Sequence, residues 1–141
     1  MKKTITLKWN QTTFATMKDL DSTNFYLFMR FGKIIYIGMT GVTSKQSVQD
    51  EINSKKASMF EGNVKGVSVW LGCKINKNGD TNAIQRLNDE IVRDVENLLI
   101  CKIKPCKNVQ CVNKYDGRDL LIVNNGCQKL PKKIDSSEFK K

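Results

Sequence analysis

The alternation of apolar and polar residues predicts a β-hairpin over residues 25–40. Two apolar runs, residues 24–29 and 34–38, flank a short polar connection. Glycine readily adopts the positive φ of a tight turn, so Gly32 marks the turn between them. The hairpin is the most strongly patterned short-range feature of the chain.

Other segments show different patterns. Apolar residues recur at helical spacing over residues 82–102 and predict an amphipathic helix. A run of β-formers over residues 66–75 predicts a third strand, and Ser47 followed by acidic residues predicts a second helix start. Residues 4–9 alternate as in an edge strand or a packed N-terminal arm.

The chain has 141 residues, 40% of them hydrophobic, which suits one domain. Its net charge of +10 divides as +6 over residues 1–80, −2 over 81–100 and +6 over 101–141. Such charge attracts polyanions, which makes nucleic acid the first partner to consider; a lysine-rich surface without a partner is the alternative. Lysine supplies most of the charge, so we expect contacts to the phosphate backbone more than base readout.

Neither a membrane-spanning run nor a signal-peptide core is evident, so an intracellular, cytoplasmic protein is expected. The chain has no histidine, and its five cysteines do not suggest a disulfide framework. A four-cysteine zinc site remains open, although no close Cys-x-x-Cys pair is present. Its ligands would be Cys101, Cys106, Cys111 and Cys127.

Two tyrosines in the hairpin, Tyr26 and Tyr36, would on their own be interpreted as core residues. Together with the Tyr36-Ile37-Gly38 sequence and a later segment that contains Glu96, Pro105 and Asn108, the pattern resembles the GIY-YIG nuclease family. The resemblance covers roughly residues 24–108. Helical spacing places Glu96 at the border of the apolar stripe, where a carboxylate can meet a cation with little competing water.

The resemblance implies metal-assisted hydrolysis of a phosphodiester bond. It implies that Glu96 binds Mg²⁺ or Mn²⁺, that Tyr26 acts as general base and that Tyr36 orients water or phosphate. Gly38 would let the backbone approach the ligand closely, and Asn108 would hold either the chain or a tyrosine beside the phosphate.

The family's first helix carries an arginine that holds the scissile phosphate, but in this chain Glu51 occupies that position. Three explanations stay open. A lysine (Lys45, Lys55 or Lys56) supplies the charge; a remote arginine, such as Arg118, reaches the site; or the site no longer cuts. Arg118 and its neighbours form either a nucleic-acid clamp or a cap on the sheet, and the sequence favours neither.

We therefore expect an α/β (α+β) fold, GIY-YIG-like, with a small, mainly antiparallel three-stranded sheet packed by helices and a β-rich C-terminal extension. The expected organisation is an N-terminal arm (residues 1–23), a nuclease domain (24–108) and an extension packed on it (109–141). The expected function is a metal-dependent DNA endonuclease. The alternative is a catalytically degenerate protein of the same fold that binds nucleic acid or a protein partner.

Overall fold

The N-terminal segment forms a long strand, because every second residue of its middle part is apolar and buried. Ile5, Leu7 and Trp9 lie on one face of this strand and are at most 1% exposed. The computed structural model describes residues 2–17, 23–40, 48–75, 89–108 and 114–139. Its strands are β1 (Lys3–Thr12), β2 (Phe25–Arg30), β3 (Lys33–Met39), β4 (Val67–Lys74), β5 (Leu120–Asn125) and β6 (Lys133–Asp135). Its helices are α1 (Val48–Phe60), α2 (Asp89–Ile103) and the short 3₁₀ helix η2 (Ser136–Glu138).

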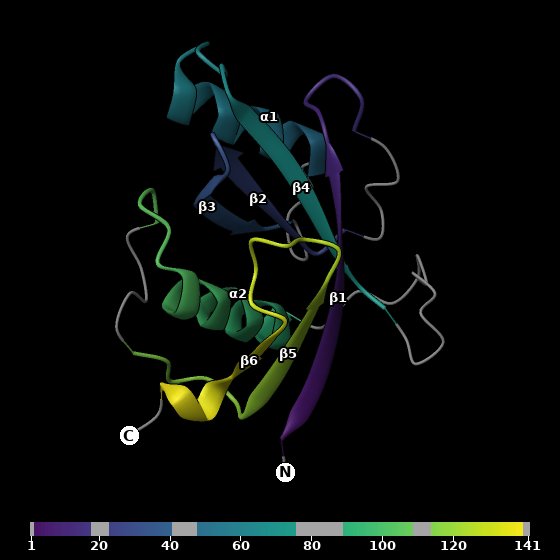
Figure 1. Ribbon diagram of the computed structural model, residues 1–141, viewed down its shortest axis with the longest axis vertical. Helices are drawn as coiled ribbons and strands as arrows, with labels where there is room; N and C mark the ends of the chain where they lie inside the picture. The colour runs from purple at the N-terminus through teal and green to yellow at the C-terminus, as the bar shows by residue number, and fades with distance from the viewer. Residues whose placement is uncertain (1, 18–22, 41–47, 76–88, 109–113, 140–141) are drawn as a thin grey trace.

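The six strands form one mixed, strongly twisted sheet in the order β3-β2-β4-β1-β5-β6 (Figure 1). β1 lies inside the sheet, antiparallel to β4 on one side and parallel to β5 on the other. The remaining neighbours are antiparallel. The sheet therefore joins the N-terminal segment, the hairpin region and the C-terminal segment.

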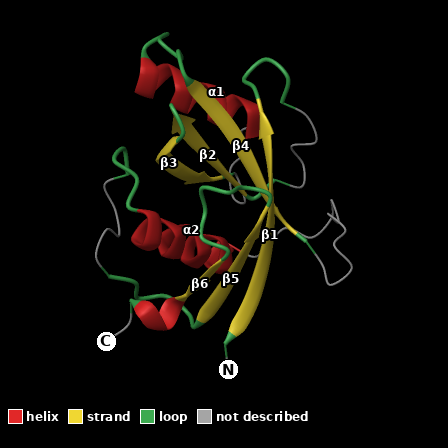
Figure 2. Ribbon diagram, in the orientation of Figure 1, coloured by secondary structure: helices red, strands yellow, loops and turns green. Residues whose placement is uncertain are grey.

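This architecture corrects the expected fold class. A three-stranded sheet packed by helices is wrong, because the sheet has six strands and dominates the two α-helices of the described residues (Figure 2). β1 adds a full row of apolar side chains to the core, and β5 alternates buried and half-buried residues along its length. β1 pairs with β4 and β5, and β5 pairs with β1 and β6, so both strands lie inside the sheet.

The two α-helices cover opposite faces of the sheet. α2 packs with residues of all six strands, and Leu98 and Leu99 are fully buried in that core. α1 packs through Ile52 and Phe60 against Tyr26 and other residues on the second face. Burying a leucine or isoleucine contributes about 1.5–3 kcal/mol, so these few side chains anchor both helices.

Several predictions of local structure are confirmed. The hairpin forms as β2 and β3, with a register shift between Phe28 and Met29, and Gly32 has φ +79° in the turn. The third strand appears as β4, and the described part of the long helix is α2. Ser47, the expected cap of α1, lies outside the described residues. In the part of the chain that the structure describes, no helix is both long and apolar enough to cross a membrane.

Candidate functional site

The hairpin register places Tyr26 and Tyr36 on the same face of the sheet. Tyr26 is paired with Gly38, and Phe28 is paired with Tyr36. The centroids of the two tyrosine rings are 6.0 Å apart. Tyr26 is 1% exposed, whereas Tyr36 is half-buried. The structure therefore brings together the two tyrosines that the sequence singled out.

Phe28 completes this aromatic group, although sequence analysis did not include it. Its ring centroid lies 5.4 Å from that of Tyr26 and 5.9 Å from that of Tyr36. The two-residue period of a strand would have placed Phe28 on the same face as Tyr26. Phe28 is fully buried, so it packs against the two tyrosine rings and does not contact solvent.

Gly38 lies directly under the Tyr26 ring. A Cβ atom on Gly38 would lie 2.5 Å from Tyr26 Cζ and 2.6 Å from its hydroxyl oxygen. The space above Gly38 is thus occupied by Tyr26. The missing side chain of Gly38 therefore makes room for the Tyr26 ring, and close approach of the backbone to a ligand stays a prediction.

Two carboxylates on different helices act on Tyr26. Glu96 of α2 is 8% exposed, and one carboxylate oxygen of Glu51 of α1 is buried. Burial of the phenol is the main cause that raises the pKa of Tyr26 far above its usual value. Negative charge on Tyr36, Glu51 and Glu96 raises it further, as does a side-chain hydrogen bond with Tyr36. In the chain alone, Tyr26 is a protonated phenol at neutral pH.

Asn108 holds the chain and not a tyrosine. Its side-chain Oδ1 accepts a hydrogen bond from the Ile37 amide, and its Nδ2 donates to the Ile37 carbonyl oxygen, both at 2.9 Å. The adjacent Lys107 amide donates to the Ile35 carbonyl oxygen at 2.9 Å. The segment after α2 thereby binds along edge strand β3 and fixes the backbone between Tyr36 and Gly38.

Lys55 is the candidate cation that the structure places at the site. Its Nζ lies 5.6 Å from the centroid of the Tyr36 ring, and its side chain is exposed. Lys55 follows Glu51 by one helical turn, so both project from the same side of α1. Lys56 lies elsewhere, with its Nζ 4.9 Å from the centroid of Phe14. Lys45 falls outside the described residues.

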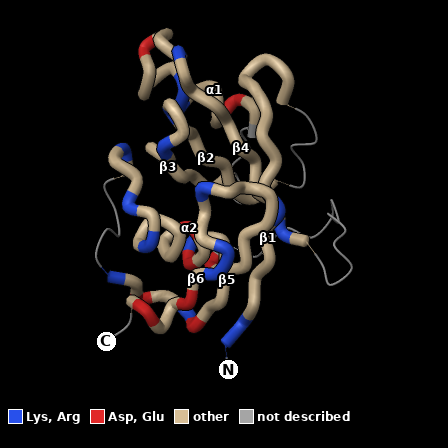
Figure 3. The backbone as a smooth tube through the Cα atoms, in the orientation of Figure 1, with Lys and Arg blue, Asp and Glu red and all other residues tan. Residues whose placement is uncertain are grey.

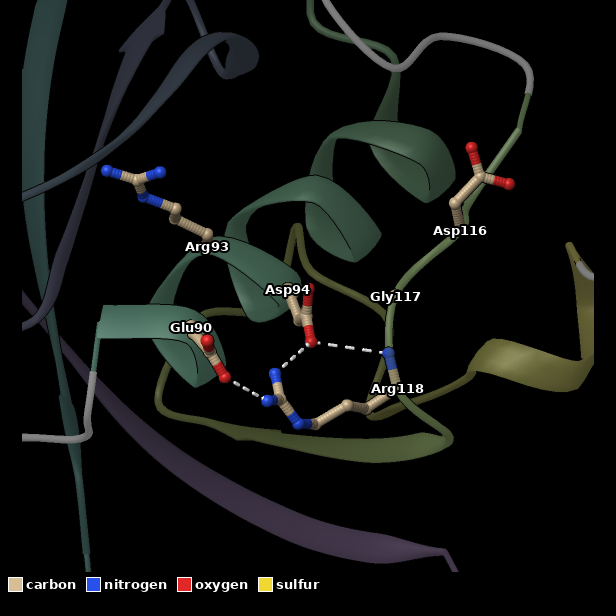
Figure 4. A pocket seen from close by; sticks show the side chains of 6 residues that line it. All are labelled: Glu90, Arg93, Asp94, Asp116, Gly117 and Arg118. Atoms are coloured by element: carbon tan, nitrogen blue, oxygen red, sulfur yellow. Dashed lines mark hydrogen bonds and ion pairs between the residues drawn. The ribbon is translucent and has the colours of Figure 1, made fainter.

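Arg118 is not part of this site. Its guanidinium binds Glu90 and Asp94 of α2, with Nη1 2.8 Å from an Asp94 carboxylate oxygen, and Arg93 points away from them (Figure 4). Glu90 and Asp94 are one turn apart, while Glu96 is about 200° further round the helix than Asp94. The structure therefore places Arg118 with two carboxylates on another side of α2 from Glu96.

The donor set at the site suits a hard divalent cation. Mg²⁺ commonly takes one or two carboxylates and completes its shell with water and substrate phosphates. Glu96, a carboxylate that is 8% exposed, would supply one such ligand, and water and substrate would supply the others. Among the described residues, no group of three His, Cys, Asp or Glu side chains forms a metal site.

Among the described residues, the cysteines form no zinc site of the kind that the sequence left open. Cys101 is disulfide-bonded, so its sulfur is not available as a thiolate ligand. Cys106 is exposed and free, whereas Cys127 is free but buried. Cys111 lies outside the described residues.

Comparison of the chain with protein-family models, with curated proteins and with solved structures returned no match.

Proposed function

We propose that this protein is a metal-dependent DNA endonuclease of the GIY-YIG type. The observation that carries the proposal is the pairing of Tyr26 with Tyr36, whose ring centroids are 6.0 Å apart, on the face where Glu51 of α1 also raises the pKa of Tyr26. A nearly buried carboxylate such as Glu96, which is 8% exposed, is costly unless it is paired or binds a cation. The net charge of +10 is suited to a DNA substrate. A DNA substrate also favours the cytoplasmic location expected from the sequence.

In the proposed mechanism, Glu96 would hold Mg²⁺ or Mn²⁺, which would supply Lewis acidity at the phosphate and positive charge that favours the phenolate of Tyr26. Tyr26 would first lose its phenol proton to solvent, and the phenolate would then accept a proton from the attacking water as that water bonds to phosphorus and the leaving oxygen departs. Tyr36 would orient that water through its hydroxyl group. Lys55, above Tyr36, binds the phosphate as a point charge in place of the family's arginine.

A second candidate, a protein that binds nucleic acid without cutting it, is favoured by Glu51. A carboxylate at the arginine position repels a phosphodiester, and it also helps to keep Tyr26 protonated. Both effects oppose catalysis unless a cation is bound.

Cleavage of supercoiled plasmid and of short branched DNA, with Mg²⁺ or Mn²⁺ and with EDTA, tests the proposal. Tyr26→Phe and Glu96→Gln should each lower the cleavage rate by about 10²–10⁴-fold, the usual contribution of a general base or a charged ligand. Two matched controls are available. Tyr115→Phe changes another buried tyrosine, whose hydroxyl donates to the Arg118 carbonyl oxygen, and Glu90→Gln changes a carboxylate on the same helix.

Metal-dependent cleavage that is lost in the two site variants and kept in the two controls supports the nuclease. DNA binding without cleavage of any substrate contradicts it and favours the non-hydrolytic protein. Equal cleavage by all variants shows that the catalytic assignment is wrong.

A further inference from the structure

Four lysines from three separate segments line one pocket beside the start of β3. Lys33 comes from the hairpin, Lys102 and Lys104 from the end of α2, and Lys129 from the β5–β6 connection. The pocket has a volume of about 340 Å³, and we call it the lysine pocket. Figure 3 shows lysines and arginines along the segment that leaves α2 and at the neighbouring turns.

The charges in the lysine pocket are poorly compensated. Lys102 forms an ion pair with Glu138 at 3.3 Å. Within the described ranges, no ion pair engages Lys33, Lys104 or Lys129. Like charges held close together repel each other, so this arrangement favours an anionic ligand.

The end of α2 explains only part of this charge. A helix C-terminus carries about half a negative charge, which suits Lys102 and Lys104. It does not account for the two lysines that come from other segments. The turn residue Gly32 brings one of them close, since a Cβ on Gly32 would lie 3.8 Å from Lys129 Cε.

The lysine pocket lies on the same edge strand as the candidate site. Lys33 begins β3, the Lys107 amide binds the Ile35 carbonyl oxygen further along, and Lys55 lies over the Tyr36 ring. Three residues of a strand span about 10 Å. This separation allows the pocket and Tyr36 to contact nearby phosphates of one DNA strand, which carries one phosphate per nucleotide.

We propose that the lysine pocket binds phosphates of a DNA backbone that lie close, along the same strand, to the phosphate at Tyr36. The identity of the polyanion rests on the proposed function, whereas the binding itself does not require cleavage. The pocket fixes how the strand lies along β3 and has no part in the chemistry. Because its contacts are lysine–phosphate contacts, they carry no base specificity.

Salt-dependent binding measurements distinguish phosphate contacts in the lysine pocket from a general effect of positive charge. Lys33→Gln with Lys129→Gln removes two pocket charges, and Lys3→Gln with Lys8→Gln removes two exposed charges from β1. Binding of a short labelled DNA duplex is measured by fluorescence anisotropy in EDTA, where no cleavage occurs, over a series of KCl concentrations. Both double variants should keep the wild-type unfolding midpoint, since all four lysines are exposed.

For the pocket variant, the slope of log Kd against log salt should fall by about 2, because each lost phosphate contact lowers it by about 0.9. At about 0.1 M salt this corresponds to roughly eightfold weaker binding per contact. The β1 variant should keep the wild-type slope. Equal slopes and affinities for the two double variants overturn the proposal. Loss of binding in the pocket variant of a protein that never cuts DNA leaves the pocket established and refutes only the nuclease.

Discussion

Replacing Gly38 with alanine should displace the Tyr26 ring and destabilise the fold. The new Cβ would lie 2.5, 2.6 and 2.8 Å from Tyr26 Cζ, Oη and Cε1. Carbon atoms normally pack at about 3.5–4.0 Å, so the ring would have to move by about 1 Å. Tyr26 is 1% exposed and packs against Phe28 and Tyr36, which leaves little room for this movement. Overpacking of this kind costs about 1–3 kcal/mol of unfolding free energy.

A double-mutant cycle measured by urea unfolding isolates the cause. Tyr26→Leu removes all three of the atoms that the new Cβ would meet. Gly38→Ala in that background should therefore be neutral or stabilise the protein by about 0.5 kcal/mol, the usual advantage of alanine over glycine within a strand. An equal cost of Gly38→Ala in both backgrounds would show that Tyr26 does not fill the space above Gly38.

Three further predictions concern the same region. Folded Tyr26 stays protonated at pH values where the unfolded side chain, with its ordinary pKa of 10.0, ionises. The free energy of unfolding should therefore fall as the pH rises above about 10. In Tyr26→Phe this fall should be shallower by about 1.4 kcal/mol per pH unit. Asn108→Ala should cost about 2–3 kcal/mol and speed hydrogen exchange of the Ile37 amide, because it leaves two buried backbone groups of Ile37 unpaired; unchanged exchange would refute this role. Arg118→Gln should leave DNA affinity and any cleavage rate unchanged, since Glu90 and Asp94 hold that arginine away from the tyrosines; a loss of either would place it in the site after all.

Local signals in the sequence were sufficient for the hairpin and the described helices. Gly32 and the two flanking apolar runs define the hairpin within a few residues, and the 3.6-residue period of α2 is equally local. The size of the sheet was missed because the pairing of β1 with β4 and β5 joins segments far apart in the chain. An alternating pattern shows that a strand has a buried face, but it does not show which strands lie beside it.

The candidate site shows the same limit: contacts between distant segments are not visible in a local pattern. Tyr26, Tyr36, Glu96 and Asn108 were predicted from the order of motifs that resembles the GIY-YIG family, and not from local pattern alone. The partners of Arg118 were not predicted, because a positive charge in the sequence does not identify its partner. Glu90 and Asp94, four residues apart on a helix, were a signal that a cation from another segment could be bound there.

The position of β1 has a consequence for how the protein is made. Lys3 pairs with Leu120, so β1 leaves the ribosome more than a hundred residues before its parallel partner β5 does. Until then, its backbone hydrogen-bonding groups on one side are unpaired, and the apolar row of Ile5, Leu7 and Trp9 lacks part of its cover. Pairing between such distant segments is slow, and an unpaired strand edge promotes association between chains. A chain that ended after α2 would keep that edge permanently open, so we expect residues 114–139 to be needed for folding to a monomer even if they take no part in chemistry.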